Sequence, residues 1–263
     1  MYIIKVGGGS TINLDGVVSD LAALEQPFLV VLGANALRDD LGRRLGQEKV
    51  QLTSVSGYSS VFSDADAIDL IMMAYSGLSN RRFVQLCQRD GVNAIGMTGL
   101  DGRLIQGRRN RGIKVRENGK TLIKRDFSGK PVKVNVALLT TLLDQGYRPV
   151  LSIPIIDEAG FAINSENDDI VAVLQDALKA DKVIQLIEAP GFLEDKNDEG
   201  SMLQTLSASE IKAREASVEG RMKRKMLALG RLFDAGAHEV IISDGRTVHP
   251  VLDALAGKGT TIR

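Results

Sequence analysis

Two lysines, each close to glycines, and one aspartate are the residues whose types and spacing could do chemistry. Lys5 precedes Gly7 and Gly8 after an apolar start, Lys225 closes the segment 219–225, and Asp168 precedes an apolar helical run. Two fixed ammonium groups, bare glycine amides and an acid that orients one lysine suit the charge that builds on a migrating phosphoryl group. The pattern predicts a phosphotransferase.

The glycines after the first two apolar runs are candidates for binding phosphate. Gly7 and Gly8 follow the first run, and Gly33 and Ala34 follow the second. A parallel sheet places its ligand crevice at such strand ends, and bare backbone amides there can approach phosphate closely. No Walker-type pattern is present. The first motif by itself is equally compatible with a tight turn, and the second by itself favours a structural turn.

Polar residues before and after the later strands are further candidates. The Asn164 amide could bind a substrate carboxylate, and Asp168 could hold a lysine, although both residues also favour helix capping. Gly191 and Glu194 follow another apolar run and could border a nucleotide, or form a plain turn. In the basic run 221–225 most cations are expected to be solvated.

Composition excludes several classes of function. The 263 residues carry 33 basic and 33 acidic side chains, so a global nucleic-acid binder is not expected. A single cysteine, Cys87, excludes an internal disulfide and fits a reducing compartment. Two histidines and one cysteine do not make an ordinary structural zinc site, and no metal-ligating residue is predicted. Without a signal-peptide pattern or a run of ~20 apolar residues, we expect a soluble cytoplasmic protein.

Short apolar runs alternate with helical patterns along the chain. Strands are expected at Tyr2–Val6, Phe28–Leu32, Ala94–Met97, Val150–Pro154, Val183–Ile187 and Glu239–Ile242. Helices are expected at Asp15–Leu24, Asp64–Ser76, Arg81–Asp90, Lys133–Gln145, Asp168–Lys179 and Gly220–Ala235, and polar Ser207–Glu219 as a surface loop. This alternation predicts a three-layer α/β/α sandwich with a mainly parallel central sheet. A boundary near residue 165 would give two lobes, 1–164 and 165–263.

The segment 103–125 interrupts the alternation. It holds nine Lys or Arg residues, among them Arg108, Arg109, Arg111 and Lys114, against one acid. Asn118-Gly119 between short runs is typical of a hairpin turn, so we expect an antiparallel hairpin protruding from the sheet. The charge favours docking of a polyanion or an acidic protein, and the alternative is protection of a sheet edge.

Taken in order, these motifs resemble the amino acid kinase family over essentially the whole chain. The similar segments are Lys5–Gly8, Gly33, 91–102, 162–168 and 220–225. Within the family the chain is similar to the acetylglutamate kinase branch. It is especially similar to the kinases that act on aminoadipate or glutamate attached to an acidic amino-group carrier protein, LysW.

The resemblance implies ATP-dependent phosphorylation of a side-chain carboxylate to an acyl phosphate with Mg²⁺, in lysine- or arginine-type biosynthesis. It implies that Lys5 and Lys225 stabilise the transferring phosphoryl group and that Asp168 orients the two lysines. It also implies that the amides of Gly8 and Gly33 bind phosphate and that Asn164 contacts the substrate. ATP would lie on the C-terminal lobe near Gly191, Glu194, Gly220 and Met222. The acceptor and the carrier would bind the N-terminal lobe, and the chain would form a homodimer.

Two departures from the family pattern bear on the substrate. Leu32-Gly33-Ala34 stands where relatives have His-Gly-Gly, and Val61 stands where they place an arginine for the α-carboxylate. Valine cannot replace a bidentate carboxylate partner. Either the α-carboxylate is bound elsewhere, or the substrate differs, or the chain has lost activity. Two alternative functions stay open: a kinase of a free acid such as N-acetylglutamate, and a non-catalytic nucleotide-binding or sensor homologue.

Overall fold

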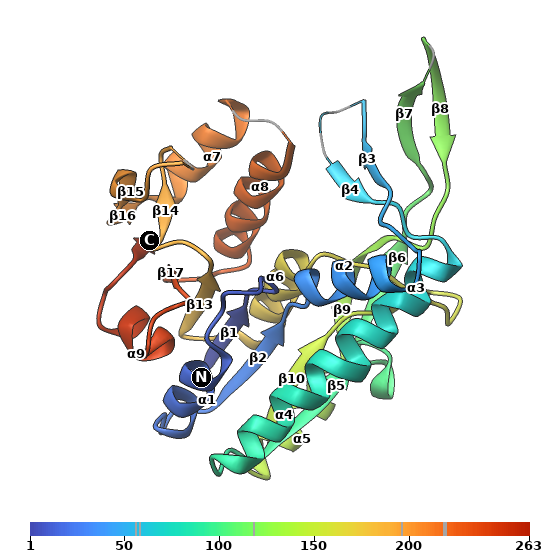
Figure 1. The fold of residues 1–263 in the computed structure, drawn as a ribbon. Coiled ribbons are helices and arrows are strands. Elements are labelled where there is room, and N and C mark those ends of the chain that lie inside the picture. Colours follow the sequence, from blue (N-terminus) through green and yellow to red (C-terminus); the bar gives the residue numbers. More distant parts are fainter. Residues whose placement is uncertain (56, 58, 118, 196, 218–219) are drawn as a thin grey trace.

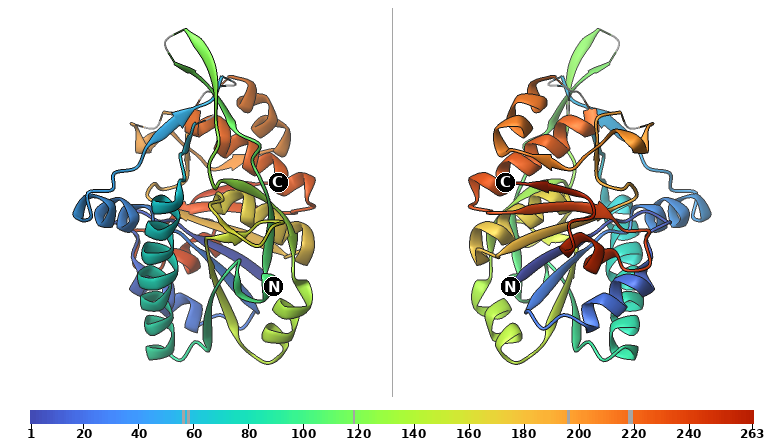
Figure 2. Two further views of the ribbon diagram at one scale, coloured as in Figure 1. Left: turned by 90° about the vertical axis from the view of Figure 1, so that its right-hand side faces the viewer. Right: turned by 90° about the vertical axis from the view of Figure 1, so that its left-hand side faces the viewer.

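The computed structural model describes residues 1–55, 57, 59–117, 119–195, 197–217 and 220–263. Its centre is an eight-stranded sheet in the order β16-β18-β17-β13-β1-β2-β10-β5, with helices on both faces (Figures 1 and 2). All neighbouring strands pair in parallel except β17 with β18. The strands are β1 Tyr2–Val6, β2 Phe28–Leu32, β5 Ala94–Thr98, β10 Arg148–Ser152, β13 Lys182–Ile187, β16 Thr205–Leu206, β17 Val240–Asp244 and β18 Thr260–Ile262. The predicted α/β/α architecture is confirmed.

The inner strands are apolar because both of their faces are covered. All five residues of β2 are buried. Leu29 belongs to the core on one side of the sheet and Val30 to the core on the other, as the alternation of side chains along a strand requires. Six of these strands coincide, within two residues at each end, with the runs expected from the sequence.

The helices form two layers around the sheet. Buried side chains of α1, α4 and α9 pack on one face, and those of α5, α6 and α8 pack on the other. The helices are α1 Leu14–Ala22, α2 Asn35–Arg44, α3 Ala65–Ile71, α4 Asn80–Arg89, α5 Val136–Asp144, α6 Asn167–Leu178, α7 Ala208–Ser217, α8 Gly220–Asp234 and α9 Pro250–Leu255. Three single-turn or irregular helical segments are the π-helix Met72–Ser79 and the 3₁₀ turns Asp101–Arg103 and Glu199–Ser201.

Three expectations about helices are corrected. The helix expected from Lys133 begins at Val136, because residues 129–134 form a strand. The helices expected at 64–76 and 81–90 are joined by the π-helix Met72–Ser79. The segment expected as a surface loop at 207–219 contains α7.

The protruding hairpin is confirmed, but it is shorter than the basic segment. It consists of β7 Ile113–Glu117 and β8 Lys120–Lys124, paired antiparallel, and it stands away from the central sheet in Figures 1 and 2. Gly119 has a φ of 74°, the left-handed conformation that a tight turn requires, while Asn118 lies outside the described residues. The extended hairpin is therefore limited to residues 113–124.

Arg108 and Arg109 are not part of this hairpin. They lie on β6 Ile105–Arg109, which pairs antiparallel with β9 Gly129–Val134 in a separate four-stranded sheet. That sheet also contains β11 Ile155–Ile156 and β12 Ala162–Ile163, and two-stranded pairs are formed by β3 Gln51–Thr53 with β4 Ser59–Val61 and by β14 Phe192–Leu193 with β15 Met202–Leu203.

One sheet connects the two expected lobes. The four strands that follow residue 165 lie together on one side, and β13 pairs directly with β1. The division into 1–164 and 165–263 stays a prediction, and any such lobes share a backbone-paired sheet. Among the helices of the described chain, none is long and apolar enough to cross a membrane.

Candidate active site

Two cavities meet at the carboxyl ends of β1 and β13. The smaller has a volume of about 200 Å³ and the larger about 550 Å³. Lys5, Asp168 and Lys225 line both, together with Ile187 and Ala189. The three charged residues singled out from the sequence therefore lie where the cavities join.

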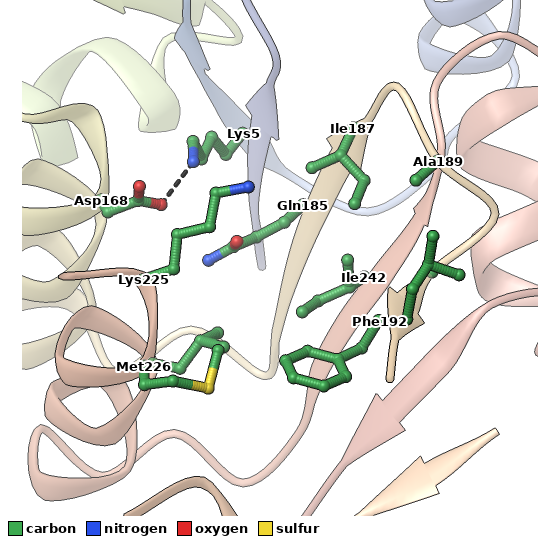
Figure 3. A pocket seen from close by; sticks show the side chains of 12 residues that line it. Lys5, Asp168, Gln185, Ile187, Ala189, Phe192, Lys225, Met226 and Ile242 are labelled. Atoms are coloured by element: carbon green, nitrogen blue, oxygen red, sulfur yellow. Dashed lines mark hydrogen bonds and ion pairs between the residues drawn. The ribbon is translucent and has the colours of Figure 1, made fainter. Parts of the chain in front are cut away.

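Each of these three side chains is positioned by a different element. Lys5 is near the end of β1, and Asp168 is in the first turn of α6, where the helix dipole favours an acid. Their ion pair is largely shielded, with side-chain exposures of 14% and 22%. Lys225 comes from α8, and in Figure 3 its side chain extends toward the Lys5–Asp168 pair. The Arg231–Asp169 ion pair, 2.5 Å between Nη1 and Oδ1, ties α8 to α6.

The two glycine turns pack against each other along the larger cavity. A Cβ on Gly8 would lie 2.5 Å from the backbone nitrogens of Ala34 and Asn35, and one on Gly33 would lie 2.6 Å from that of Gly8. Only glycine fits at either position. The turns thus bring the backbone after β1 close to the N-terminus of α2, where unpaired amides favour anions.

Not every amide in these turns is available to a ligand. The Gly7 amide donates to the Leu186 carbonyl and the Gly33 amide to the Val6 carbonyl, each at 2.9 Å. The expectation that Gly33 offers its own amide to phosphate is corrected: it continues the β1–β2 ladder and contributes its lack of a side chain. Within the described part of the chain, the Gly8 amide has no backbone acceptor.

The far wall of the larger cavity is polar. Asn164 lines it and donates from Nδ2 to Ser63 Oγ at 2.9 Å. Ser165 Oγ and Asn167 Oδ1, on the same wall, are buried without a hydrogen-bond partner among the described residues. Such atoms are costly to bury unpaired, so this wall is suited to a ligand with polar groups.

Tyr75 and Arg38 also line the larger cavity, and neither is among the site residues that the sequence predicts. Tyr75 projects from the π-helix and donates its hydroxyl to Asn35 Oδ1; burial raises its pKa to about 12, while the charge of Arg38 acts in the opposite direction. Arg38 lies on α2, which is outside the expected helices. A polar helix directly after a buried strand and Gly33-Ala34 was the available signal.

The smaller cavity has an apolar wall. Phe192, Met226, Leu229 and Ile242 line it, as Figure 3 shows for three of them. Gly191 lines it as well, and a Cβ there would lie 2.7 Å from Thr260 Oγ1. A flat aromatic ring beside two ammonium groups fits this combination of surfaces.

Glu194, Gly220 and Met222 are the other residues expected near a nucleotide. Glu194 is exposed, forms an ion pair with Arg214 at 3.1 Å, and is not among the residues lining either cavity. The expectation that Glu194 contacts a nucleotide therefore gains no support from the cavity. Gly220 is the first residue of α8, and the side chain of Met222 lies outside the described residues.

The basic residues expected to dock a carrier separate into two groups. Arg108, Arg111 and Lys114 are exposed. Arg109 is half-buried: its guanidinium lies 3.9 Å from the centre of the Phe127 ring, and Nε donates to the Asp126 carbonyl at 2.8 Å. Arg109 therefore packs against the segment that contains Asp126 and Phe127. Of the residues expected to dock a carrier, Arg108, Arg111 and Lys114 are the exposed ones.

Charge at the junction suits a phosphorylated nucleotide better than a bare metal ion. Among the described residues, no three His, Cys, Asp or Glu side chains lie together in a group that could hold a metal ion. Asp168 is already paired with Lys5. A divalent cation would therefore be held mainly by the phosphates and water, as Mg²⁺ usually is in nucleotide sites.

Comparison with known proteins places the chain among kinases. The family model "Amino acid kinase family" matches residues 1–244. The chain is 38% identical to a [LysW]-aminoadipate kinase of Thermus thermophilus over 100% of both chains. It is 36% identical to a [LysW]-aminoadipate kinase of Deinococcus radiodurans over 100% of this chain and 91% of that one.

The fold is shared with a more distant enzyme. The structure aligns with N-acetylglutamate synthase from Neisseria gonorrhoeae with a TM-score of 0.80, at 20% identity, over 99% of this chain and 58% of that chain. The family match, the full-length relatives and the lysine–aspartate junction agree, and the chain belongs to the amino acid kinase family of phosphotransferases.

Proposed function

We propose that this protein is an ATP-dependent kinase of an acidic amino acid, aminoadipate or glutamate, attached to an acidic amino-group carrier protein. The observation that carries the proposal is the junction of two cavities at Lys5, Asp168 and Lys225. The apolar cavity, lined mainly by the 165–263 half, would take the base of ATP. The polar cavity, lined mainly by the 1–164 half, would take the acceptor.

In the reaction an acceptor carboxylate oxygen forms a bond to the γ-phosphorus while the bond to the β-phosphate bridging oxygen breaks, giving an acyl phosphate and ADP. ATP, with Mg²⁺, supplies the phosphoryl group. Lys5 and Lys225 stabilise the charge on the transferring group, and Asp168 fixes the position of Lys5. The Gly8 turn allows the backbone to approach the phosphate without a side chain in between.

The names of the full-length relatives support a carrier-bound acceptor. Both the Thermus thermophilus and the Deinococcus radiodurans proteins are [LysW]-aminoadipate kinases. On this chain Arg108, Arg111 and Lys114 are exposed cations on β6, β7 and the connection between them. They would attract an acidic carrier, in lysine- or arginine-type biosynthesis in the cytoplasm. A homodimer, also part of the proposal, is testable by sedimentation equilibrium.

The test is ATP turnover with hydroxylamine, which converts an acyl phosphate into a hydroxamate. The acceptors are the carrier protein bearing aminoadipate or glutamate, free aminoadipate, free glutamate and N-acetylglutamate. We expect hydroxamate only from a carrier-bound acid. Hydroxamate only from a free acid would overturn the carrier, and ATP binding with no hydroxamate from any acceptor would overturn the kinase.

Lys225→Ala tests the chemistry of the junction. Because it removes a cation from the transferring phosphoryl group, kcat should fall by about 10²- to 10³-fold. The matched control is Lys212→Ala on the neighbouring α7, whose ion pair with Asp234 is exposed. Equal rates for Lys225→Ala and the wild type would contradict the mechanism.

Charge reversal tests the carrier surface. Arg111→Glu with Lys114→Glu should raise KM for the carrier-bound acid at least about tenfold at low salt, because steering by charge is lost. KM for ATP should not change. The control is Lys258→Glu, which changes an exposed lysine between α9 and β18. An unchanged KM for the carrier-bound acid would remove the docking surface from the proposal.

A further inference from the structure

Arg38 and Val61 line the same polar cavity. Val61 is apolar at a position where the resemblance leads us to expect an arginine, so the cavity lacks that cation. Arg38, from the first half of α2, is only 9% exposed. A nearly buried guanidinium on a cavity wall needs an anionic partner.

The partner within the protein satisfies only part of Arg38. Its Nε and Nη2 atoms donate to a single oxygen, Asp39 Oδ1, at 3.0 and 2.6 Å. The other oxygen, Asp39 Oδ2, is paired with Lys49. Two cations thus share one carboxylate, and the cluster keeps one net positive charge beside the cavity.

The position of Arg38 on its helix adds to this positive potential. α2 begins at Asn35, so Arg38 lies about one turn from the N-terminus, and its first turn contains no acid. The helix dipole disfavours a cation there and favours an anion. Tyr75 lines the same cavity and donates its hydroxyl to Asn35 Oδ1 at this N-terminus. Its pKa is raised mainly by burial, while the charge of Arg38 lowers it and that of Glu166, on the same cavity, raises it.

We propose that Arg38 binds the α-carboxylate of the acceptor, the carboxylate that does not receive the phosphoryl group. Arg38 would thereby replace the missing arginine from a different element. The planar guanidinium pre-oriented by Asp39 can donate to a carboxylate with its free edge. Ser165 Oγ, buried on the same cavity without a partner among the described residues, offers a further contact for a polar acceptor. The substrate class is then an N-acylated dicarboxylic α-amino acid, and this assignment depends on the proposed function.

The test compares two probes in the hydroxamate assay: the carrier bearing aminoadipate, and the same carrier bearing its α-carboxamide. The wild type should prefer the carboxylate in kcat/KM by about 10- to 100-fold, since a hydrogen-bonded charge pair is lost in the amide. Arg38→Met should abolish this preference by lowering activity on the carboxylate alone. Arg43→Met, an exposed arginine on the same helix, should keep the preference.

The outcomes separate this inference from the proposed function. Activity on the carrier-bound acid with an undiminished preference in Arg38→Met would overturn the role of Arg38 and leave the kinase intact. No hydroxamate from either probe with the wild type would overturn both. If circular dichroism shows that Arg38→Met is unfolded, Arg38→Lys decides: a reduced preference supports the assignment, and a full preference overturns it.

Discussion

At the scale of single residues, the junction depends on how one carboxylate holds one ammonium group. Asp168 stands in the first turn of α6 and pairs with Lys5, which reaches it from the neighbouring strand. The pair is largely shielded, but both side chains line the two cavities, through which water can reach them, so the pair contributes little to folding. Its main effect is to fix the position of a cation that the chemistry uses.

Asp168→Asn separates these two effects. Lys5 loses its charged partner, so kcat should fall by about tenfold or more while the melting temperature stays within about 2 °C of the wild type. Steady-state kinetics and thermal denaturation measure the two. Asp176→Asn, on the same helix in an exposed ion pair with Lys179, should change neither. A large loss of melting temperature with unchanged kcat would make Asp168 a structural residue.

At the scale of elements, α1 anchors α9 through a buried acid. Asp20 is 1% exposed. Its Oδ2 accepts from the amides of Val251 and Leu252 at 2.8 and 3.1 Å, and its Oδ1 lies 2.9 Å from His249 Nδ1. A side chain from a distant segment thus caps the first turn of α9 and joins two helices that cover one face of the sheet.

Asp20→Ala should lower the free energy of unfolding by about 2 kcal/mol, because it leaves the buried amide of Val251 and the part-buried amide of Leu252 without an acceptor. Urea denaturation gives the value. The control is Asp15→Ala on the same helix, where the carboxylate is exposed and pairs with Arg89. That change should stay within about 0.5 kcal/mol. Equal losses for the two variants would exclude the cap.

Elements with strong local signals could be predicted from the sequence. β1 and β2 were expected with their observed bounds, because each is a short apolar run ended by glycine. The helix α7 was missed although a signal existed: Ser207 and Glu210 form a capping box, with Ser207 N donating to Glu210 Oε2 at 2.7 Å. Its residues are mostly polar, so apolar periodicity gave no indication.

Site residues fixed by distant contacts could not be predicted in the same way. Lys5, Asp168 and Lys225 were expected together because the chemistry needs them together, and the structure places them at one junction. The basic run predicts Arg109 on the docking surface, but its guanidinium packs on the Phe127 ring and donates to the Asp126 carbonyl. No pattern within residues 103–111 reports a contact made by residues 126 and 127.

At the scale of the whole molecule, a continuous sheet unites the two halves of the chain. β13 pairs with β1 along five residue positions, from Tyr2 opposite Lys182 to Val6 opposite Leu186. The core clusters on both faces contain residues from either half. Neither half can unfold without exposing the edge of the other.

We therefore expect one cooperative unfolding transition. Differential scanning calorimetry should give a van't Hoff enthalpy equal to the calorimetric enthalpy, because unfolding one half would expose the sheet edge and the core of the other. Proteins of this size often unfold in steps, so the measurement distinguishes one cooperative unit from two halves that unfold separately. Two resolved transitions would show that the halves on either side of residue 165 are separate folding units.

The meeting of the two cavities has a consequence for inhibition. Lys5, Asp168 and Lys225 line both cavities, so one molecule that extends past these side chains would contact both. A bisubstrate inhibitor that joins adenosine through a short polyphosphate to a dicarboxylic acid would occupy both at once. Because its second half binds intramolecularly, its affinity should exceed that of either fragment by about 10²- to 10⁴-fold.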